Sequence, residues 1–177
     1  MDEARRDAAT FLPRAREIAN PQTLTPALTQ AAFAFAAGGD LDEAVSLAAE
    51  FERTARKRSA AFPFPVLPTM LRICMAAGDL TLAQSLVDEA AEAADSKLLL
   101  HSITTGRAIL ADARGQTEEA AALYREAAAW GEWGSVPERA YALLGLGRCG
   151  DQDAAREAAA IFARLGAAPV VAQVAAA

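Results

Sequence analysis

Apolar residues recur along this chain three and four positions apart. The clearest stretch begins at residue 41 and carries Leu41, Ala44, Val45, Leu47, Ala48 and Phe51. A second stretch, after residue 80, carries Leu82, Ala83, Leu86, Val87 and Ala90. Residues at this spacing share one side of an α-helix, so each stretch predicts a helix with one apolar face. β-branched residues are sparse, and we therefore expect an all-α protein.

Glycine, proline and capping residues divide this pattern into helices. Pro13 is expected to interrupt or restart the first helix, and Asn20-Pro21 to end it before a polar linker. Thr25-Pro26 is expected to open the second helix, with the threonine as its N-cap. In order, the expected helices cover about residues 2–20, 25–37, 40–59, 68–77, 80–94, 97–114, 117–130, 136–149, 151–165 and 169–176.

Polar residues at the starts of these segments predict how the helices begin. Asp40 and the pair Asp95-Ser96 precede apolar stretches and are expected to act as caps. Ser135 and Glu138 have the spacing of a capping box, in which each side chain bonds the other residue's backbone N–H. The proline-rich stretch 62–68 is expected to form a loop and the opening turn of the next helix.

A short signature recurs four times: a glycine, a polar residue, and an alanine four positions after the polar one. The glycines are 39, 37 and 35 residues apart. A near-constant period of this length is typical of stacked helix–turn–helix units, each burying its apolar face on its neighbours. We expect four such units with an extra helix at each end. The copies begin at Gly39, Gly78, Gly115 and Gly150 and reach Ala44, Ala83, Ala120 and Ala155.

Composition and charge exclude several function classes. The 177-residue chain is 53% apolar and only 6% aromatic, with a net charge of −6, so it lacks the basic footprint of a nucleic-acid-binding protein. Its one local basic cluster, residues 53–58, either complements a helix dipole or forms a partner-binding patch. Without a signal-peptide pattern or a run of about 18 apolar residues, we expect a cytoplasmic protein with no membrane association.

Candidate catalytic chemistry is sparse. His101 is the only histidine, and Cys74 and Cys149 alone are too few for a zinc site, which needs three or four ligands. The stretch from Gly145 to Arg148 lacks the further glycines of a dinucleotide-binding loop. Acidic pairs such as Asp42-Glu43 are typical of a solvated helix face. We therefore expect no enzymatic activity, no metal and no cofactor.

The repeated signature resembles the tetratricopeptide repeat family. The closest copy runs from Arg107 to Trp130 and contains Gly115-Gln116-Thr117-Glu118-Glu119-Ala120 and Leu123-Tyr124-Arg125-Glu126-Ala127. The resemblance implies a right-handed α-α superhelix of about four repeats over residues 24–166, between an N-terminal segment 1–23 and a C-terminal capping helix 167–177, in one continuous domain. The family's loop proline is missing, and the spacings exceed its usual 34 residues.

The same resemblance implies that the first helix of each repeat lines a concave groove that binds a protein or peptide. Arg72 and Arg148 could bind an acidic peptide or a phosphate, or could pair with Asp112 or face solvent. Trp130 and Trp133 either hold the inter-repeat loop or serve as a binding anchor. By alignment the groove residues are Gln30, Phe33, Thr69, Arg72, Met75, Ser102, Thr105, Ile109, Asp112, Tyr141, Leu144 and Arg148.

A second resemblance covers the C-terminal part. Residues 138–148, with Ala155-Arg156-Glu157 and the stretch 161–167, resemble the helical-repeat tails of bacterial regulators of the maltose-activator and LuxR type and of cyclase-linked ATPases. This resemblance implies an alternative function, a ligand-sensing region of a bacterial transcriptional regulator. A third alternative is a homo-oligomerisation module, in which the alanine-rich faces or the terminal helix pack into a dimer.

Overall fold

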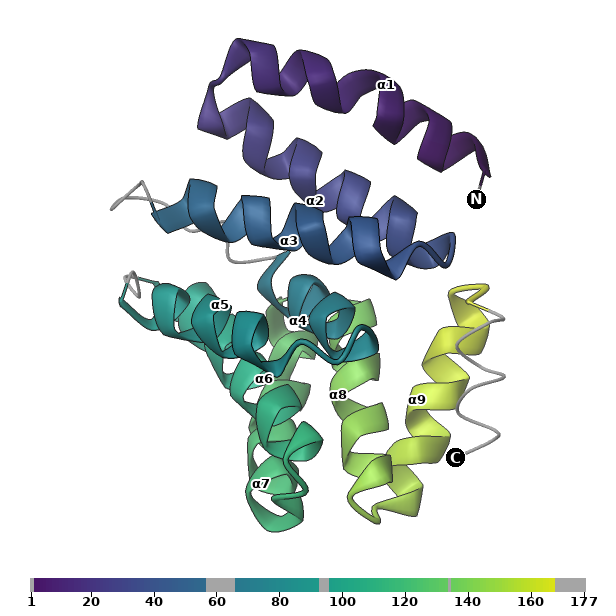
Figure 1. The fold of residues 1–177 in the computed structure, drawn as a ribbon. Helices are drawn as coiled ribbons and strands as arrows, with labels where there is room; N and C mark the ends of the chain where they lie inside the picture. The colour runs from purple at the N-terminus through teal and green to yellow at the C-terminus, as the bar shows by residue number, and fades with distance from the viewer. Residues whose placement is uncertain (1, 57–65, 93–95, 134, 168–177) are drawn as a thin grey trace. The chain divides into compact units, whose positions relative to one another are not determined.

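The fold is helical throughout the described part of the chain. The computed structural model describes residues 2–56, 66–92, 96–133 and 135–167, and every regular element in these ranges is a helix (Figure 1). This confirms the all-α prediction. None of the described helices combines the length and apolar character that crossing a membrane requires.

The elements follow the predicted order. The α-helices are α1 (Asp2–Ile18), α2 (Pro21–Ala37), α3 (Leu41–Arg56), α4 (Leu67–Ala76), α5 (Leu80–Glu92), α6 (Lys97–Ala113), α7 (Thr117–Ala127), α8 (Val136–Arg148) and α9 (Gln152–Arg164). A short 3₁₀ helix, η2 (Ala128–Trp133), follows α7 directly. The expected C-terminal helix 169–176 falls outside the described residues, as do residues 57–59 at the expected end of the third helix.

Each signature glycine lies in the turn between two antiparallel helices. Gly39, Gly78, Gly115 and Gly150 have φ values of 85°, 75°, 72° and 105°, a conformation that residues with a Cβ rarely adopt. The turns join α2 to α3, α4 to α5, α6 to α7 and α8 to α9, and the two helices of each pair are in contact. The described part of the chain thus contains the four expected hairpins, preceded by the extra helix α1.

The residue after the glycine caps the second helix in three of the four hairpins. Backbone N–H groups donate to Oδ1 of Asp40 (3.4 Å), Asp79 (2.9 Å) and Asp151 (3.0 Å), which satisfies a donor that the helix leaves unpaired. In the third hairpin, α6–α7, the corresponding residue Gln116 makes no such bond. Ser96 caps α6 as predicted, because its hydroxyl accepts from the N–H of Leu99 (3.2 Å).

Three local predictions about helix starts are wrong. Pro13 lies inside α1 and does not interrupt it. The second helix begins at Pro21, where Asn20 is the N-cap and accepts from the N–H of Gln22 (2.9 Å), so Thr25-Pro26 lies within α2. Proline is well tolerated at the first helical position because its missing N–H would have no partner there. Ser135 is the N-cap of α8 but makes no side-chain bond, so the capping box does not form.

The contacts divide the chain into two compact units. The first comprises residues 1–95, in which α2 contacts α1, α3 and α4, and α3 contacts α4 and α5. The second comprises residues 96–177, in which α8 contacts α6, α7, η2 and α9. Successive hairpins thus pack in the same way in both units: α4 packs on both α2 and α3, and α8 packs on both α6 and α7.

Small side chains lie where the helices of a hairpin cross. Ala44, Ala83 and Ala120 are fully buried, as the repeat signature predicts. In the last hairpin a Cβ added to Gly147 would lie 2.7 Å from Cβ of Ala155, closer than side chains pack. The backbones of α8 and α9 therefore approach so closely that only glycine fits opposite this alanine.

Candidate functional site

Phe33 on α2 is the most exposed large apolar side chain among the predicted groove residues. It is 54% exposed, and Gln30, one helical turn earlier, is also exposed. The other exposed positions of α2 repeat at the same spacing, so they form one stripe along the helix. This stripe consists of Gln22, Thr23, Pro26, Gln30, Phe33 and Ala37.

The first helix of the next hairpin, α4, has a matching stripe. Thr69, Arg72 and Met75 are half-buried, whereas the residues between them are buried. Arg72 has an interaction of its own within the protein. α2 and α4 contact each other, and both contact α3. We use the name α2–α4 face for the exposed and half-buried residues Gln30, Phe33, Thr69, Arg72 and Met75 of these two neighbouring helices.

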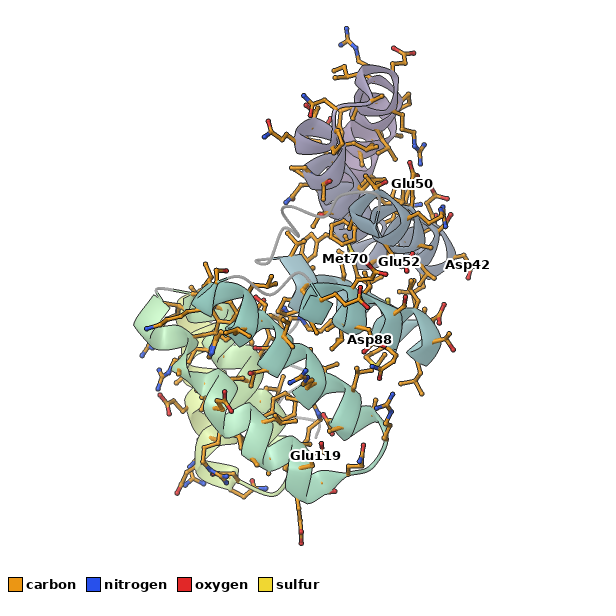
Figure 2. All side chains as sticks on the ribbon, turned by 90° about the vertical axis from the view of Figure 1, so that its left-hand side faces the viewer. Asp42, Glu50, Glu52, Met70, Asp88 and Glu119 are labelled. Carbon is orange, nitrogen blue, oxygen red and sulfur yellow. The ribbon has the colours of Figure 1, made fainter. Side chains whose placement is uncertain are left out.

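Charge in the first unit is distributed unevenly between the helices. α2 contains no charged residue, and Arg72 is the only one in α4. The helical carboxylates lie on the other three helices: Asp2, Glu3, Asp7 and Glu17 on α1, Asp42, Glu43, Glu50 and Glu52 on α3, and Asp88, Glu89 and Glu92 on α5 (several are labelled in Figure 2). The α2–α4 face is therefore free of acidic residues in a chain whose net charge is −6.

Three predicted groove residues of the second unit, Ser102, Thr105 and Ile109, lie inside its core. Thr105 is 1% exposed and Ile109 is 8% exposed. The hydroxyl of Thr105 accepts from Nε1 of Trp130 (2.8 Å) and donates to the carbonyl of His101 (3.0 Å). Because the hydroxyl of Thr105 is bonded internally, Thr105 cannot line a groove, and its prediction as a groove residue is wrong. The same prediction for Ile109 is wrong because its side chain is buried. Ser102 is also fully buried.

Trp130 holds the segment after α7 against α6. Its indole is 3% exposed and meets the His101 ring edge to face, with centroids 4.5 Å apart. Nε2 of His101 lies 3.1 Å from the carbonyl oxygen of Ala127, and this geometry requires the tautomer that donates from Nε2. Of the two roles considered for Trp130, the structural one is confirmed. The side chain of Trp133 lies outside the described residues.

Arg148 pairs with Asp112, the local pairing that was one of its two expected roles. Its Nε and one terminal nitrogen lie 2.9 Å and 2.5 Å from Oδ2 of Asp112. Tyr124 completes the cluster, because its hydroxyl donates to Asp112 (3.1 Å) and accepts from Arg148 (3.0 Å). The cluster joins α6, α7 and α8 through charge-assisted hydrogen bonds.

Sequence reasoning did not predict that Tyr124 takes part in this cluster. The ring is buried against the backbone of α8, where a Cβ on Gly145 would lie 2.4 Å from its Cζ atom. Burial raises the pKa of Tyr124 above its ordinary value. Burial lowers the pKa of Arg148, but Tyr124 and Asp112 together raise it by more, so the net shift is upward. The sequence feature that could have indicated this packing is a bulky residue, Tyr124, in one helix and a glycine, Gly145, in the next.

The remaining groove candidates of the second unit are half-buried. Tyr141 packs edge to face on Phe162 of α9, with ring centroids 4.9 Å apart. Leu144 lies one turn further along α8 and is also half-buried. Within this unit, the structure therefore leaves Tyr141, Leu144 and the Asp112–Arg148 pair accessible in part, a smaller set than the alignment predicted.

Groups that could perform chemistry are few among the described residues. No cluster of three or more His, Cys, Asp or Glu side chains there could hold a metal ion. Cys74 is buried in the first unit, and burial raises the pKa of its thiol to about 12, so it is protonated at neutral pH. Cys149 is partly exposed, and burial, the largest cause, also raises its pKa.

Comparison with known proteins adds no assignment. No protein-family model matches the chain, and no curated protein matches it at a significant level.

Proposed function

We propose that this protein is a non-catalytic scaffold of tetratricopeptide-like repeats whose α2–α4 face binds an extended or helical peptide segment of a partner protein. Four hairpins with left-handed glycine turns support the repeat architecture. So does the packing between successive hairpins, in which α4 contacts both α2 and α3, and α8 contacts both α6 and α7. Stacked repeats of this kind expose extended surfaces that bind other proteins.

The observation that carries the proposal is the exposure of Phe33. Large aromatic side chains contribute much of the binding energy at protein interfaces, usually near the centre of the patch. Phe33 lies on a helix without charged residues, beside a second helix that presents Thr69 and Met75. A partner that covers Phe33 therefore buries an aromatic ring and desolvates no carboxylate on these two helices.

The partner is expected to contribute an apolar side chain that packs against Phe33 and Met75. Methionine adapts its shape to different neighbours, which suits a surface that receives an apolar side chain. Nucleic acid is not the expected partner, because the chain carries 23 acidic residues and 17 basic ones. Membrane association is not part of this proposal.

A selection from random linear peptides displayed on phage tests this function. The enriched peptides are synthesised with a fluorophore, and their Kd is measured by fluorescence polarisation for the wild type and for Phe33→Ala. Truncating a central aromatic anchor is expected to raise Kd about tenfold or more. Because Phe33 is exposed, the substitution is expected to change stability by no more than about 0.5 kcal/mol.

Leu100→Ala is the matched control. Leu100 is also 54% exposed and lies on α6, in the other unit. Its truncation removes similar exposed apolar surface and is expected to change Kd less than about twofold. Peptides that bind Phe33→Ala as tightly as the wild type would remove the α2–α4 face from consideration. A selection that enriches no peptide would contradict the proposed function itself.

A further inference from the structure

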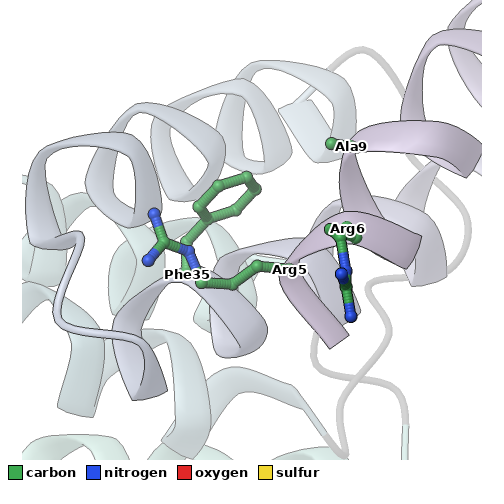
Figure 3. Close-up of a pocket in the computed structure, with 4 residues that line it drawn as sticks. All are labelled: Arg5, Arg6, Ala9 and Phe35. Atoms are coloured by element: carbon green, nitrogen blue, oxygen red, sulfur yellow. The ribbon is translucent and has the colours of Figure 1, made fainter. Parts of the chain in front are cut away.

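A pocket lies between α1 and the C-terminal half of α2, and none of its lining residues belongs to the α2–α4 face. It has a volume of about 340 Å³ and is lined by Arg5, Arg6, Ala9 and Phe35 (Figure 3). Ligand pockets in proteins span roughly 300–1,000 Å³. This one lies at the lower end of that range and is widely open to solvent. It combines an aromatic ring with two guanidinium groups, and its lining contains no carboxylate.

Arg5 forms a fixed wall of the pocket. Its guanidinium carbon lies 5.6 Å from the centroid of the Phe35 ring, and one terminal nitrogen lies 3.2 Å from Oδ2 of Asp40. The stem of Arg5 passes over Gly38, where an added Cβ would lie 2.4 Å from Cδ of Arg5. The absence of a side chain at Gly38 therefore makes room for this arrangement, and Asp40 balances the charge of Arg5.

Arg6 supplies the second guanidinium group of the pocket. Its side chain is exposed, and among the described residues it has no carboxylate partner. Figure 3 shows it projecting from α1 separately from Arg5, which passes beside the Phe35 ring. A guanidinium group binds a carboxylate through two parallel N–H···O bonds when both groups are accessible.

We propose that this pocket binds a small aromatic carboxylate. The ring of the ligand packs against Phe35 and Ala9, since stacked or edge-to-face aromatic pairs are favourable at this range. The carboxylate pairs with Arg6 at the opening. A cationic ligand is disfavoured because two guanidinium groups line the pocket. This inference concerns a different surface from the proposed peptide site, and it stands or falls independently of it.

Benzoate is the probe that tests the proposal. The ¹⁵N-labelled full chain is titrated with benzoate, and chemical shifts of the backbone amides are followed by NMR. Shifts are expected at residues of α1 around Arg6 and of α2 around Phe35. Benzamide, which has the ring without the charge, and acetate, which has the charge without the ring, are each expected to bind at least about threefold more weakly than benzoate.

Arg6→Gln and Arg14→Gln form a matched pair of variants. Both remove one positive charge from an exposed position of α1, but only Arg6 lines the pocket. Arg6→Gln is expected to raise the Kd of benzoate about threefold to fivefold, and Arg14→Gln to leave it within about 1.5-fold. The difference is expected to shrink in high salt because exposed charges are screened.

Phe35→Leu tests the aromatic wall separately. It keeps an apolar side chain at the pocket and is expected to weaken benzoate binding while leaving acetate binding unchanged. Circular dichroism and thermal melting of each variant verify that the fold is retained. The proposal is overturned if benzamide or acetate binds as tightly as benzoate, if Arg6→Gln and Arg14→Gln weaken binding equally, or if benzoate produces no shifts. Binding of the blocked dipeptide acetyl-Phe-Asp-amide without binding of benzoate would also overturn it and would indicate a peptide ligand.

Discussion

At the scale of single residues, Gly145 sets one of the closest constraints in the structure. It lies under the ring of Tyr124, and an added Cβ would lie within 2.5 Å of three ring atoms. The ring cannot retreat easily, because its hydroxyl is bonded to Asp112 and Arg148. Gly145 is therefore required by the packing of this ring and not by its own backbone conformation, which is that of an ordinary helix.

Replacing Gly145 with alanine is predicted to destabilise the protein by about 1–3 kcal/mol, the usual cost of overpacking a core. In a Tyr124→Ala background the same change is predicted to stabilise by up to about 1 kcal/mol, because the clash is gone and alanine favours a helix over glycine. Urea unfolding of the four proteins measures both effects. If Gly145→Ala has the same effect in both backgrounds, the ring is not the cause.

Ala19 carries local strain. It has a φ of 52°, the left-handed region that residues with a Cβ rarely occupy, at the end of α1. For an L-residue this conformation costs roughly 1–2 kcal/mol, and part of that cost is recovered by glycine. Ala19→Gly is predicted to raise the free energy of unfolding by about 0.5–1 kcal/mol.

Ala9→Gly provides the comparison, since Ala9 is an exposed residue in the interior of the same helix. That change is predicted to lower the free energy of unfolding by about 1 kcal/mol, the ordinary cost of glycine in a helix. Opposite signs for the two substitutions in thermal or urea unfolding would verify the strain at Ala19. A loss of stability in both would contradict it.

Cys74 links stability to pH. Burial raises the pKa of its thiol from 9.0 to about 12, so the folded state holds the proton more tightly than the unfolded state does. The resulting stabilisation is complete below about pH 9 and is lost as the pH rises toward 12. The variant Cys74→Ala lacks the thiol. At pH 8 its free energy of unfolding is predicted to be about 1–2 kcal/mol lower than that of the wild type, because the substitution leaves a cavity in the core.

The two proteins are predicted to converge as the pH rises from 9 toward 11, because only the wild type loses the contribution of the thiol. Urea unfolding at several pH values measures the gap between them. A gap that stays constant over this range would show that the thiol is not held protonated by burial.

At the scale of elements, the hairpins and their turns were predictable from the sequence because their causes are local. A glycine that adopts positive φ and an aspartate that caps the next helix act within five residues, so Gly78 and Asp79 could be interpreted directly. The start of α2 was not predictable from such signals. Both Asn20 and Thr25 are good N-cap residues followed by proline, so the sequence did not distinguish them. In the structure Asn20 is the cap, and Thr25 is buried within α2.

Pro13 illustrates the same limit. Its missing N–H leaves the carbonyl of Ala9 without a helical partner, which predicts a break. The helix continues because Leu12 and Ala15 on either side are buried. Arg16 in its last turn pairs with Glu50 of α3, with Nε and Oε1 3.0 Å apart, and this hydrogen bond raises the pKa of Arg16. Tertiary contacts thus override a local signal.

The pairing of Asp112 with Arg148 is predicted to couple α6 to α8. A double-mutant cycle with Asp112→Asn and Arg148→Gln is expected to give a coupling energy of about 1 kcal/mol, since the pair is half-buried and reinforced by Tyr124. The coupling is expected to decrease in high salt. Additive effects in urea unfolding would mean that the two side chains do not interact in solution.

At the scale of the whole molecule, the sequence predicted the class of fold better than the surfaces that it exposes. The period of the glycines predicted stacked hairpins, and successive hairpins pack together within each of the two units. It could not predict that Thr105 is buried, because that depends on Trp130, 25 residues later, which donates to its hydroxyl. It also could not identify the pocket at Arg5 and Arg6, which exists only because α1 packs on α2.

The α2–α4 face is the surface on which the proposed function depends. It combines the exposed Phe33 with two helices that carry no carboxylate, whereas the helical carboxylates of this unit lie on α1, α3 and α5. If peptides bind through apolar contact with this face, binding is expected to depend only weakly on salt.

An NMR footprint of a selected peptide on the ¹⁵N-labelled protein tests this claim most directly. Amide shifts are expected to concentrate on the stripes of α2 and α4 that include Gln30, Phe33, Thr69 and Met75. No comparable shifts are expected on the acidic helices α3 and α5. A footprint centred on α3 and α5, or confined to residues 96–167, would contradict the claim.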